Sequence, residues 1–363
     1  MSSKRDKRVT AVEAAENARS PLTADRSRCL VIQTAFLGDV VLTTPLLSAL
    51  AERHGPVDVV STPVAASLLE THPAVHTVIP YDKHGAQKGW RGIRELSSEL
   101  RGRHYSIVYL PHRSIRSAAL ALLTGAKERV GFAGTPAAIS YSRRVPRSHT
   151  GHEVERLLAL AGTAAAAAPV SLGLTADDHS VADRWLQAHR VAPGFVALAP
   201  GSIWGTKRWP YYAELAARLE QRCVIVGGPG DSSLADAIVA AAPGRVVSAV
   251  GALGLRGSAA LIRRAGVLVT NDSAPLHLAT AAGTPVVALF GPTVPAFGFG
   301  PRGQGDAAVG VEGLACRPCS KHGPERCPLG HHRCMRELGV ETVVAAVAAV
   351  LSREEPGAIC PGN

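Results

Sequence analysis

The chain has 363 residues, of which 46% are hydrophobic and 19% are charged, so it is long enough to bury the cores of two domains. No run of about 18 apolar residues occurs, which argues against a transmembrane helix, and the polar first 27 residues lack the apolar stretch of a secretory signal. The formal net charge of +10 favours polyanionic partners such as nucleic acid, acidic lipid headgroups or phosphorylated glycans, without choosing among them.

The N-terminal half has the pattern of alternating strands and helices. We expect residues 1–27 to be a disordered tail and residues 28–175 to form the first domain. Its expected strands are 30–34, 57–61, 75–80, 105–110 and 129–132, and its expected helices are 40–53, 64–70, 90–100 and 114–123. Such alternation predicts a parallel sheet covered by helices on both faces.

The same pattern restarts after an alanine-rich segment at 162–169, and residues 176–363 are expected to form a second domain. Its expected strands are 195–199, 223–227, 246–250, 267–270 and 285–290, and its expected helices are 176–189, 211–220, 232–241, 258–265, 274–283 and 340–352. The fold class is therefore α/β, with two doubly wound, Rossmann-like halves facing across a cleft. The last helix is free to pack back toward the first domain.

The most informative segment is NDSAPLHLATAAGTPVVALFGPT, residues 271–293. Its polar residues stand where a strand ends and a helix begins, which is the ligand-binding edge of an open parallel sheet. A helix N-terminus offers unpaired N–H groups and a positive dipole end, both suited to phosphate. Asp272 or Ser273 can instead be an ordinary N-cap. His277, one turn further on, is either structural or a ligand contact.

Two further loops carry candidate chemistry. Asp39, in FLGD after the first strand, is either an N-cap or a cleft-facing carboxylate that takes a proton from a hydroxyl nucleophile. The loop PGSIWGTKRWP, residues 200–210, gathers hydroxyls, N–H groups and a Lys–Arg pair, which suits a diphosphate. Lys207 in this loop would neutralise a leaving diphosphate, or the loop is simply a solvated basic loop.

Several motifs are absent. The first strand is not followed by G-x-G-x-x-G, and no G-x-x-x-x-G-K-[ST] occurs, which argues against a dinucleotide enzyme and a P-loop nucleotidase. We also find no helix-turn-helix, RNA-binding aromatic pair or regular basic stripe, so a nucleic-acid partner is not expected.

Taken together, the segment LVIQTAFLGDVVLTTPLLSALAERHG, the loop PGSIWGTKRWP and the segment TNDSAPLHLATAAGTPVVALFGPT resemble the bacterial lipopolysaccharide heptosyltransferases of glycosyltransferase family 9. The Cys-rich segment CRPCSKHGPERCPLGHHRCMREL resembles the second type of this family more than the first. The resemblance implies a GT-B fold and an inverting transferase that moves L-glycero-D-manno-heptose from ADP-heptose, with no divalent metal or other cofactor required. It implies that the acceptor is the first heptose of the inner core, on a Kdo–lipid A base at the inner-membrane surface. The expected location is the cytoplasm, or the periphery of the inner membrane.

The resemblance also assigns roles to residues. Asp39 matches the general base and Lys207 the diphosphate-binding lysine. The other implied donor contacts are Ser202, Thr206, Asp231, Asp272, Ser273, Ala274 and His277. Four arginines in the first domain are weaker candidates for acceptor contacts, and solvated surface residues are the alternative for them: Arg113, Arg116, Arg143 and Arg144. Two other functions stay open, a family transferase with another sugar or acceptor, and a non-catalytic nucleotide- or polyanion-binding protein.

Four of the seven cysteines lie within 19 residues, at Cys316, Cys319, Cys327 and Cys334. Four soft ligands this close can hold zinc. Their spacing is not that of a standard zinc finger, however, and reduced thiols with a packing role or an opportunistic disulfide are favoured over a structural metal.

Overall fold

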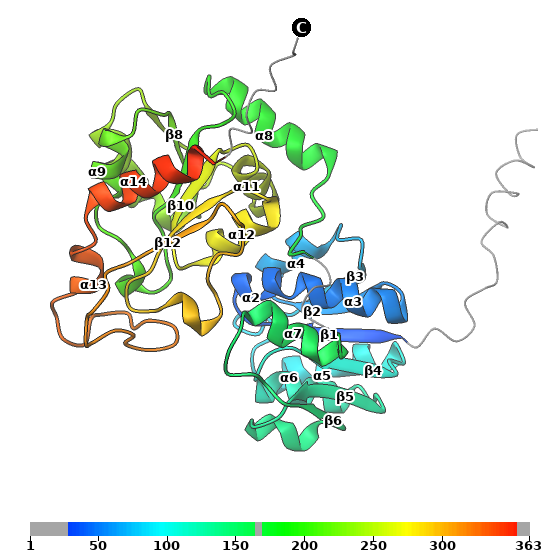
Figure 1. Ribbon diagram of the computed structural model, residues 1–363. Coiled ribbons are helices and arrows are strands. Elements are labelled where there is room, and N and C mark those ends of the chain that lie inside the picture. The colour runs from blue at the N-terminus through cyan, green and yellow to red at the C-terminus, as the bar shows by residue number, and fades with distance from the viewer. Residues whose placement is uncertain (1–27, 164–168, 354–363) are drawn as a thin grey trace, which may run out of the picture.

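A computed structural model describes residues 28–163 and 169–353 of the chain, so the expected tail at 1–27 lies outside the described residues. The two halves form separate sheets, joined by a linker and lying side by side (Figure 1). The α/β class and the two Rossmann-like halves are confirmed.

The first sheet has six parallel strands in the order β3-β2-β1-β4-β5-β6, the order of a dinucleotide-binding fold. The strands are β1 (Cys29–Gln33), β2 (Val57–Ser61), β3 (Val75–Pro80), β4 (Ile107–Leu110), β5 (Glu128–Phe132) and β6 (Arg143–Val145). The helices are α2 (Leu37–Leu42), α3 (Thr44–His54), α4 (Pro63–Leu69), α5 (Gly89–Gly102), α6 (Ile115–Leu123), the 3-10 helix η1 (Pro136–Ser140) and α7 (Glu153–Ala161).

The second sheet repeats this topology, in the order β12-β11-β10-β7-β8-β9. Its strands are β7 (Val196–Ala199), β8 (Cys223–Ile225), β9 (Val246–Ser248), β10 (Val267–Asn271), β11 (Val286–Leu289) and β12 (Ala307–Val309). Its helices are α8 (Ala176–Ala188), η2 (Gly205–Lys207), α9 (Tyr212–Arg218), η3 (Pro229–Asp231), α10 (Ser232–Ala241), α11 (Leu255–Ile262), α12 (Ala274–Ala282), η4 (Pro295–Phe297), α13 (Arg333–Arg336) and α14 (Val340–Leu351).

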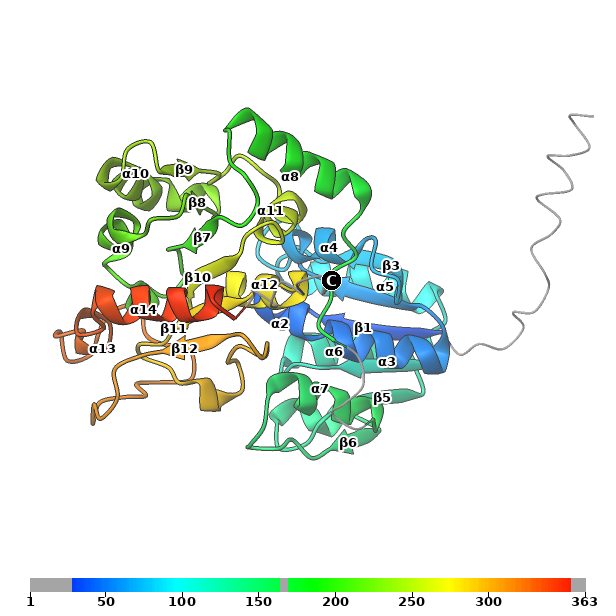
Figure 2. The same ribbon diagram turned by 45° about the horizontal axis from the view of Figure 1, so that its top comes forward.

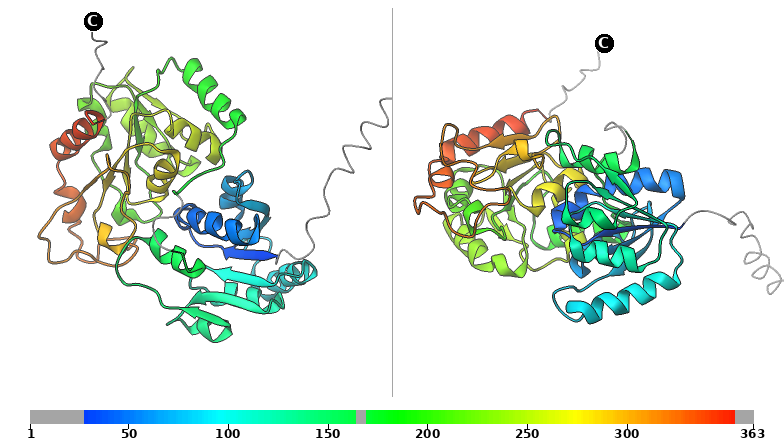
Figure 3. Two further views of the ribbon diagram at one scale, coloured as in Figure 1. Left: turned by 45° about the vertical axis from the view of Figure 1, so that its right-hand side comes forward. Right: turned by 90° about the horizontal axis from the view of Figure 1, so that it is seen from below.

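Helices cover both faces of each sheet, because alternate side chains of these apolar strands point to opposite faces and both sets are buried. In the first domain α3 and α7 pack on one face, and α5 and α6 pack on the other (Figure 3). In the second domain α9, α10 and α14 cover the outer face. The last helix therefore covers its own sheet rather than reaching back to the first domain.

One buried apolar cluster runs through both domains, from β1 and α3 of the first to α11 and α12 of the second. At its centre α2 lies directly beside α12 (Figure 2). Gly38 makes this approach possible, because a Cβ on that residue would lie 2.6 Å from Cδ2 of His277. The carboxyl ends of the two sheets consequently face each other.

The single helix expected at 40–53 is in fact two helices, α2 and α3. The proline ring of Pro45 has no N–H to donate to the carbonyl of Val41, which accepts the Thr44 hydroxyl at 2.9 Å instead. The break turns α3 along the sheet and leaves α2 as a separate short helix at its carboxyl edge. Helix α7 and the edge strands β6 and β12 were not predicted from the sequence.

The linker between the domains is held by Arg256, on α11. Its guanidinium donates to the carbonyl of Ser67 on α4 at 3.1 Å, to the carbonyl of Gly173 in the linker at 2.8 Å, and to Asp178 on α8. Burial alone would raise the pKa of Asp178, but hydrogen bonds from Arg256 and from Thr175 outweigh it and lower the pKa to about 2.

This pair makes the stability depend on pH. The folded-state pKa of Asp178 is depressed from about 3.8, so its contribution is present above pH 4 and is lost as the pH falls toward 2. We predict that Arg256→Met lowers the free energy of unfolding at pH 7 by about 2 kcal/mol and flattens its pH dependence between pH 4 and 2. Urea denaturation at several pH values measures both effects. The exposed pair of Arg218 and Glu214 offers the control Arg218→Met, and an equal loss in the control would contradict the prediction.

Candidate functional site

A cleft of about 760 Å³ lies between the two domains at the carboxyl edges of their sheets. The first domain contributes the start of α2, including Phe36 and Asp39. The second contributes the loops that follow β7, β8, β9, β10 and β11. The structure therefore gathers residues far apart in sequence at the edge where parallel sheets bind ligands.

Asp39 is the third residue of α2 and faces this cleft. Phe36, and not Asp39, is the N-cap of α2, and one Asp39 carboxylate oxygen accepts the N–H of Phe36 at 3.2 Å from the third helical position. Burial, and next the nearby Glu153 carboxylate, raise the pKa of Asp39 to about 6, against the opposing effects of the Phe36 N–H and Arg147. A carboxylate with this pKa is ionised at pH 7 and basic enough to accept a proton.

Lys207 stands across the cleft in a buried ion pair. Its Nζ donates to the Asp272 carboxylate at 2.6 Å and to the Asp272 carbonyl at 3.0 Å. The same carboxylate oxygen accepts the Thr293 hydroxyl at 2.6 Å. An ammonium has three protons, so one remains for a ligand. Asp272 thus orients Lys207 in the cleft.

Asn271 fixes the loop that carries Lys207. Its fully buried amide donates to the carbonyl of Pro200 at 2.8 Å and accepts the N–H of Trp209 at 3.1 Å and the hydroxyl of Tyr212 at 3.4 Å. One side chain therefore ties the end of β10 to both ends of the 200–210 loop.

Most of the expected donor residues meet in this cleft. Its lining includes Ser202, Lys207, Asp231, Asp272, Ser273, Ala274 and His277. Burial lowers the pKa of His277 to about 4, so its imidazole is neutral near pH 7. Asp231 lies against Gly201, where a Cβ would come within 2.3 Å of the carboxylate. Thr206 differs from the expectation, because it is buried outside the lining and its hydroxyl donates to the Pro324 carbonyl.

The four candidate arginines do not line the cleft. Arg113 is exposed near the carboxyl end of β4, and Arg116 donates to the carbonyl of Lys83 at 3.3 Å. Arg143 lies instead over the ring of Tyr109, which contacts His54 at the far end of α3. Arg144 is exposed on the edge strand β6. Arg143 is therefore remote from the cleft, because α3 runs from the carboxyl edge of the sheet to its amino edge.

Several residues near the cleft were missed by sequence reasoning. Phe297 and Phe299 form a wall of it, and Lys321 and His322 reach it from the Cys-rich segment. Lys83 is not among the lining residues, but its Nζ donates at 2.5 Å to the carbonyl of Thr34, which directly follows β1. No local pattern marks these residues, because they enter through loops that pack back over the sheet edge.

The Cys-rich segment packs on the 200–210 loop, where the His332 ring lies 2.8 Å from the Thr206 carbonyl. Within residues 28–163 and 169–353, no group of three or more His, Cys, Asp or Glu side chains is arranged to hold a metal ion. Sγ of Cys327 accepts the N–H of His332 at 3.4 Å, and Cys334 is buried in the second core. All four cysteines of the segment are free thiols: Cys316, Cys319, Cys327 and Cys334.

In the described part of the chain, no helix is both long and apolar enough to cross a bilayer.

The family model for glycosyltransferase family 9 (heptosyltransferase) matches residues 93–328. The lipopolysaccharide heptosyltransferase 1 of Pseudomonas aeruginosa is 32% identical over 316 residues, which is 81% of this chain and 86% of that protein. The lipopolysaccharide heptosyltransferase 2 of Escherichia coli K12 is 30% identical over 302 residues, which is 74% of this chain and 84% of that protein.

Solved structures agree on the fold. A glycosyl transferase family 9 structure from Veillonella parvula has a TM-score of 0.80 at 23% identity, covering 92% of this chain and all (100%) of that one. The ADP-heptose lps heptosyltransferase II of E. coli has a TM-score of 0.72 at 24% identity, covering 90% of this chain and 99% of that one.

The contacts of two neighbouring residues predict different costs of mutation. Asn271→Ala should lower the free energy of unfolding by about 3 kcal/mol, since it leaves buried polar groups of the 200–210 loop without partners. Ser273→Ala should change it by less than about 0.5 kcal/mol, since the hydrogen bond that the Ser273 hydroxyl donates to the Gly201 carbonyl is long, at 3.4 Å. Chemical denaturation of both variants tests this. Equal losses would mean that Asn271 does not have the structural role assigned to it.

Proposed function

The chain belongs to glycosyltransferase family 9, the heptosyltransferases, and from this premise we propose that it transfers a heptose from ADP-heptose to the lipopolysaccharide inner core with inversion at the anomeric carbon. One observation carries the proposal. A carboxylate of the first domain, Asp39, and an ammonium of the second, Lys207, line the same cleft. An inverting transfer needs a base on one side of the sugar and a cation on the other.

In the proposed reaction the acceptor hydroxyl enters from the first domain. Asp39 takes its proton while the hydroxyl oxygen forms a bond to the anomeric carbon of the donor. The bond from that carbon to the diphosphate oxygen breaks on the opposite face, and ADP leaves with the electron pair. The new glycosidic bond has the inverted configuration, and Asp39 returns its proton to water.

The second domain supplies the donor site. The remaining proton of Lys207 stabilises the charge that develops on the leaving diphosphate. The start of α12, at Ser273 and Ala274, adds backbone N–H groups and a positive dipole end. The neutral imidazole of His277 also faces this region of the cleft. Asp231 is proposed to accept hydrogen bonds from the ribose hydroxyls. Val226 and Leu253, which also line the cleft, form an apolar wall suited to adenine.

No divalent metal is assigned to this reaction. The positive charge that a metal would supply to the diphosphate comes in the proposal from Lys207 and the start of α12. Arg208 and Lys321 add to it, because both also line the cleft.

The acceptor is proposed to be the first heptose of the inner core, on a Kdo–lipid A base at the inner-membrane surface. Relatives of the first and second type are 32% and 30% identical, so identity alone does not separate them, and the Cys-rich segment favours the second. Lys83, Arg113 and Arg116 gather near the carboxyl edge of the first sheet, where they can meet carboxylates or phosphates of the core.

The membrane-facing side is proposed to be the same edge of the first domain. Three exposed apolar residues follow β3, β4 and β5 there, at the starts of α5 and α6 and in η1: Trp90 (74% exposed), Ile115 (68%) and Ile139 (86%). Apolar side chains flanked by cations suit an anionic lipid surface. Sedimentation with anionic vesicles tests this, and equal binding by wild type and Trp90→Ser would count against it.

Asp39 gives the proposed function its sharpest test. At pH 7.5, Asp39→Asn should lower kcat by about 10²- to 10⁴-fold, because the base is lost, while ADP affinity stays within about twofold. In the wild type kcat/KM should fall below about pH 6, where the Asp39 carboxylate becomes protonated, and the residual activity of the variant should lack this limb.

Steady-state kinetics and calorimetric ADP titration measure these effects. Asp236→Asn is the control, because this carboxylate is exposed on α10 away from the cleft. Near-normal turnover of Asp39→Asn would rule out Asp39 as the base.

A further inference from the structure

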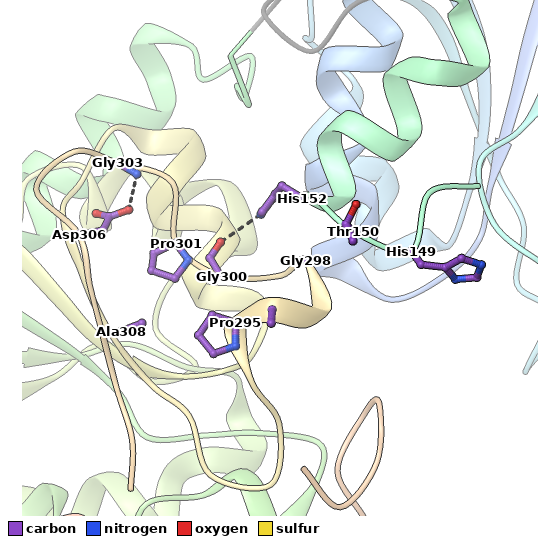
Figure 4. Close-up of a pocket in the computed structure, with 12 residues that line it drawn as sticks. His149, Thr150, His152, Pro295, Gly298, Gly300, Pro301, Gly303, Asp306 and Ala308 are labelled. Carbon is purple, nitrogen blue, oxygen red and sulfur yellow. Dashed lines mark hydrogen bonds between the residues drawn. The ribbon is translucent and has the colours of Figure 1, made fainter. Parts of the chain in front are cut away.

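The start of α7, in the first domain, is bound to a segment of the second domain at residues 295–300. The N–H of Glu153 donates to the carbonyl of Gly298 at 2.8 Å. Nε2 of His152 lies 3.1 Å from the carbonyl oxygen of Gly300, a contact that spans the two domains (Figure 4). These bonds link the domains at a further place, apart from the contact between α2 and α12 and from the bond of Arg256 to Ser67.

A buried ionic cluster lies under this junction. The Glu153 carboxylate, in a residue only 5% exposed, accepts hydrogen bonds from Arg147 at 2.5 Å and from Arg156 at 3.3 Å. The same nitrogen of Arg156 donates to the carbonyl of Phe297 at 2.8 Å. Arg156 thereby joins Glu153 of the first domain to the segment of the second. Removing one partner of such a buried cluster leaves an uncompensated charge.

The segment that Arg156 holds forms part of the cleft. Phe297 and Phe299 line the cleft. The ring of Phe299 packs against the ring of His277, with 6.3 Å between the ring centroids. Gly298 between them has φ 99°, and a Cβ there would lie 2.7 Å from a guanidinium nitrogen of Arg156. The absence of a side chain at Gly298 thus leaves room for the Arg156 guanidinium. Its contact with the backbone fixes the positions of Phe297 and Phe299.

We propose that Glu153 is a positioning residue for the transfer, which through Arg156 holds the Phe297–Phe299 wall against the donor and keeps the Asp39 side of the cleft facing it. The inference rests on the proposed function, because it concerns the same cleft. Neither Glu153 nor Arg156 lines the cleft, so each acts through other groups.

The charge of Glu153 also reaches Asp39. The charged and titratable groups around Asp39 are Glu153 and Arg147 from the β6–α7 region and His277 from α12. His277 is neutral near pH 7, so it adds no charge there. Two effects raise the pKa of Asp39: burial is the larger, and the charge of Glu153 is the second. Removing its charge should therefore lower the pKa of Asp39 and keep the base ionised at lower pH.

Two variants separate the positioning of the Phe297–Phe299 wall from the effect of the Glu153 charge on the pKa of Asp39. Glu153→Gln should move the acidic limb of kcat/KM to lower pH and raise the KM for ADP-heptose about tenfold. Arg156→Lys keeps the charge but cannot bridge Glu153 and the Phe297 carbonyl in the same way, so it should raise the KM about tenfold and leave the limb in place. Glu95→Gln is the control, since this carboxylate is 54% exposed in a surface pair with Arg91.

Calorimetric titration with ADP gives a readout that needs no turnover, and we expect about tenfold weaker binding in both variants but not in the control. An unchanged limb in Glu153→Gln together with ADP affinity within twofold of wild type in both variants would overturn the inference. If the wild type transferred no heptose, the proposed function would fail instead, and the ADP titrations would still decide whether the cluster shapes the donor site.

Discussion

The close approach of α2 and α12 is the constraint on which the site depends. It is possible because residue 38 is glycine and the His277 ring fills the space that a Cβ would need. Two consequences follow from this single contact. The short helix that carries Asp39 is held at the cleft, and the start of α12 is held opposite it. A buried apolar cluster that runs through both domains supports the contact from behind.

Electrostatics in the cleft follow from burial around this contact. Lys207 is buried, but its two bonds to Asp272 keep it paired and leave one proton for a ligand. The Asp39 carboxylate instead accepts a backbone N–H, that of Phe36, and burial followed by the Glu153 charge raises its pKa to about 6. The proposed transfer uses both groups, the lysine beside the leaving diphosphate and the carboxylate of raised pKa as the base.

Much of the fold could be predicted from sequence, because both sheets are built from short apolar strands between amphipathic helices. The GT-B arrangement and the enzyme class implied by the resemblance are confirmed. The break at Pro45, the short strand β12 and helix α7 were missed, since each depends on packing more than on a local pattern.

Asp39, Lys207 and Asp272 were placed at one edge because residues that follow parallel strands meet there. Thr206 was expected in the cleft by the same reasoning but lies outside its lining, because the Cys-rich segment covers its side of the loop. Phe297, Phe299 and Glu153 could not be found, because their positions depend on contacts between the domains. The roles given to all these residues stay predictions.

We propose above that this cleft transfers heptose to an inner-core heptose without a metal. The most direct measurement incubates the purified chain with ADP-heptose and EDTA, and with either Kdo2–lipid A or its mono-heptosylated form, and follows the acceptor by mass spectrometry. We predict that the mono-heptosylated acceptor gains the mass of one heptose and that the unheptosylated one does not. A gain only on the unheptosylated acceptor would contradict the proposed acceptor, and no gain on either, with ADP still bound, would contradict the account of donor and acceptor together.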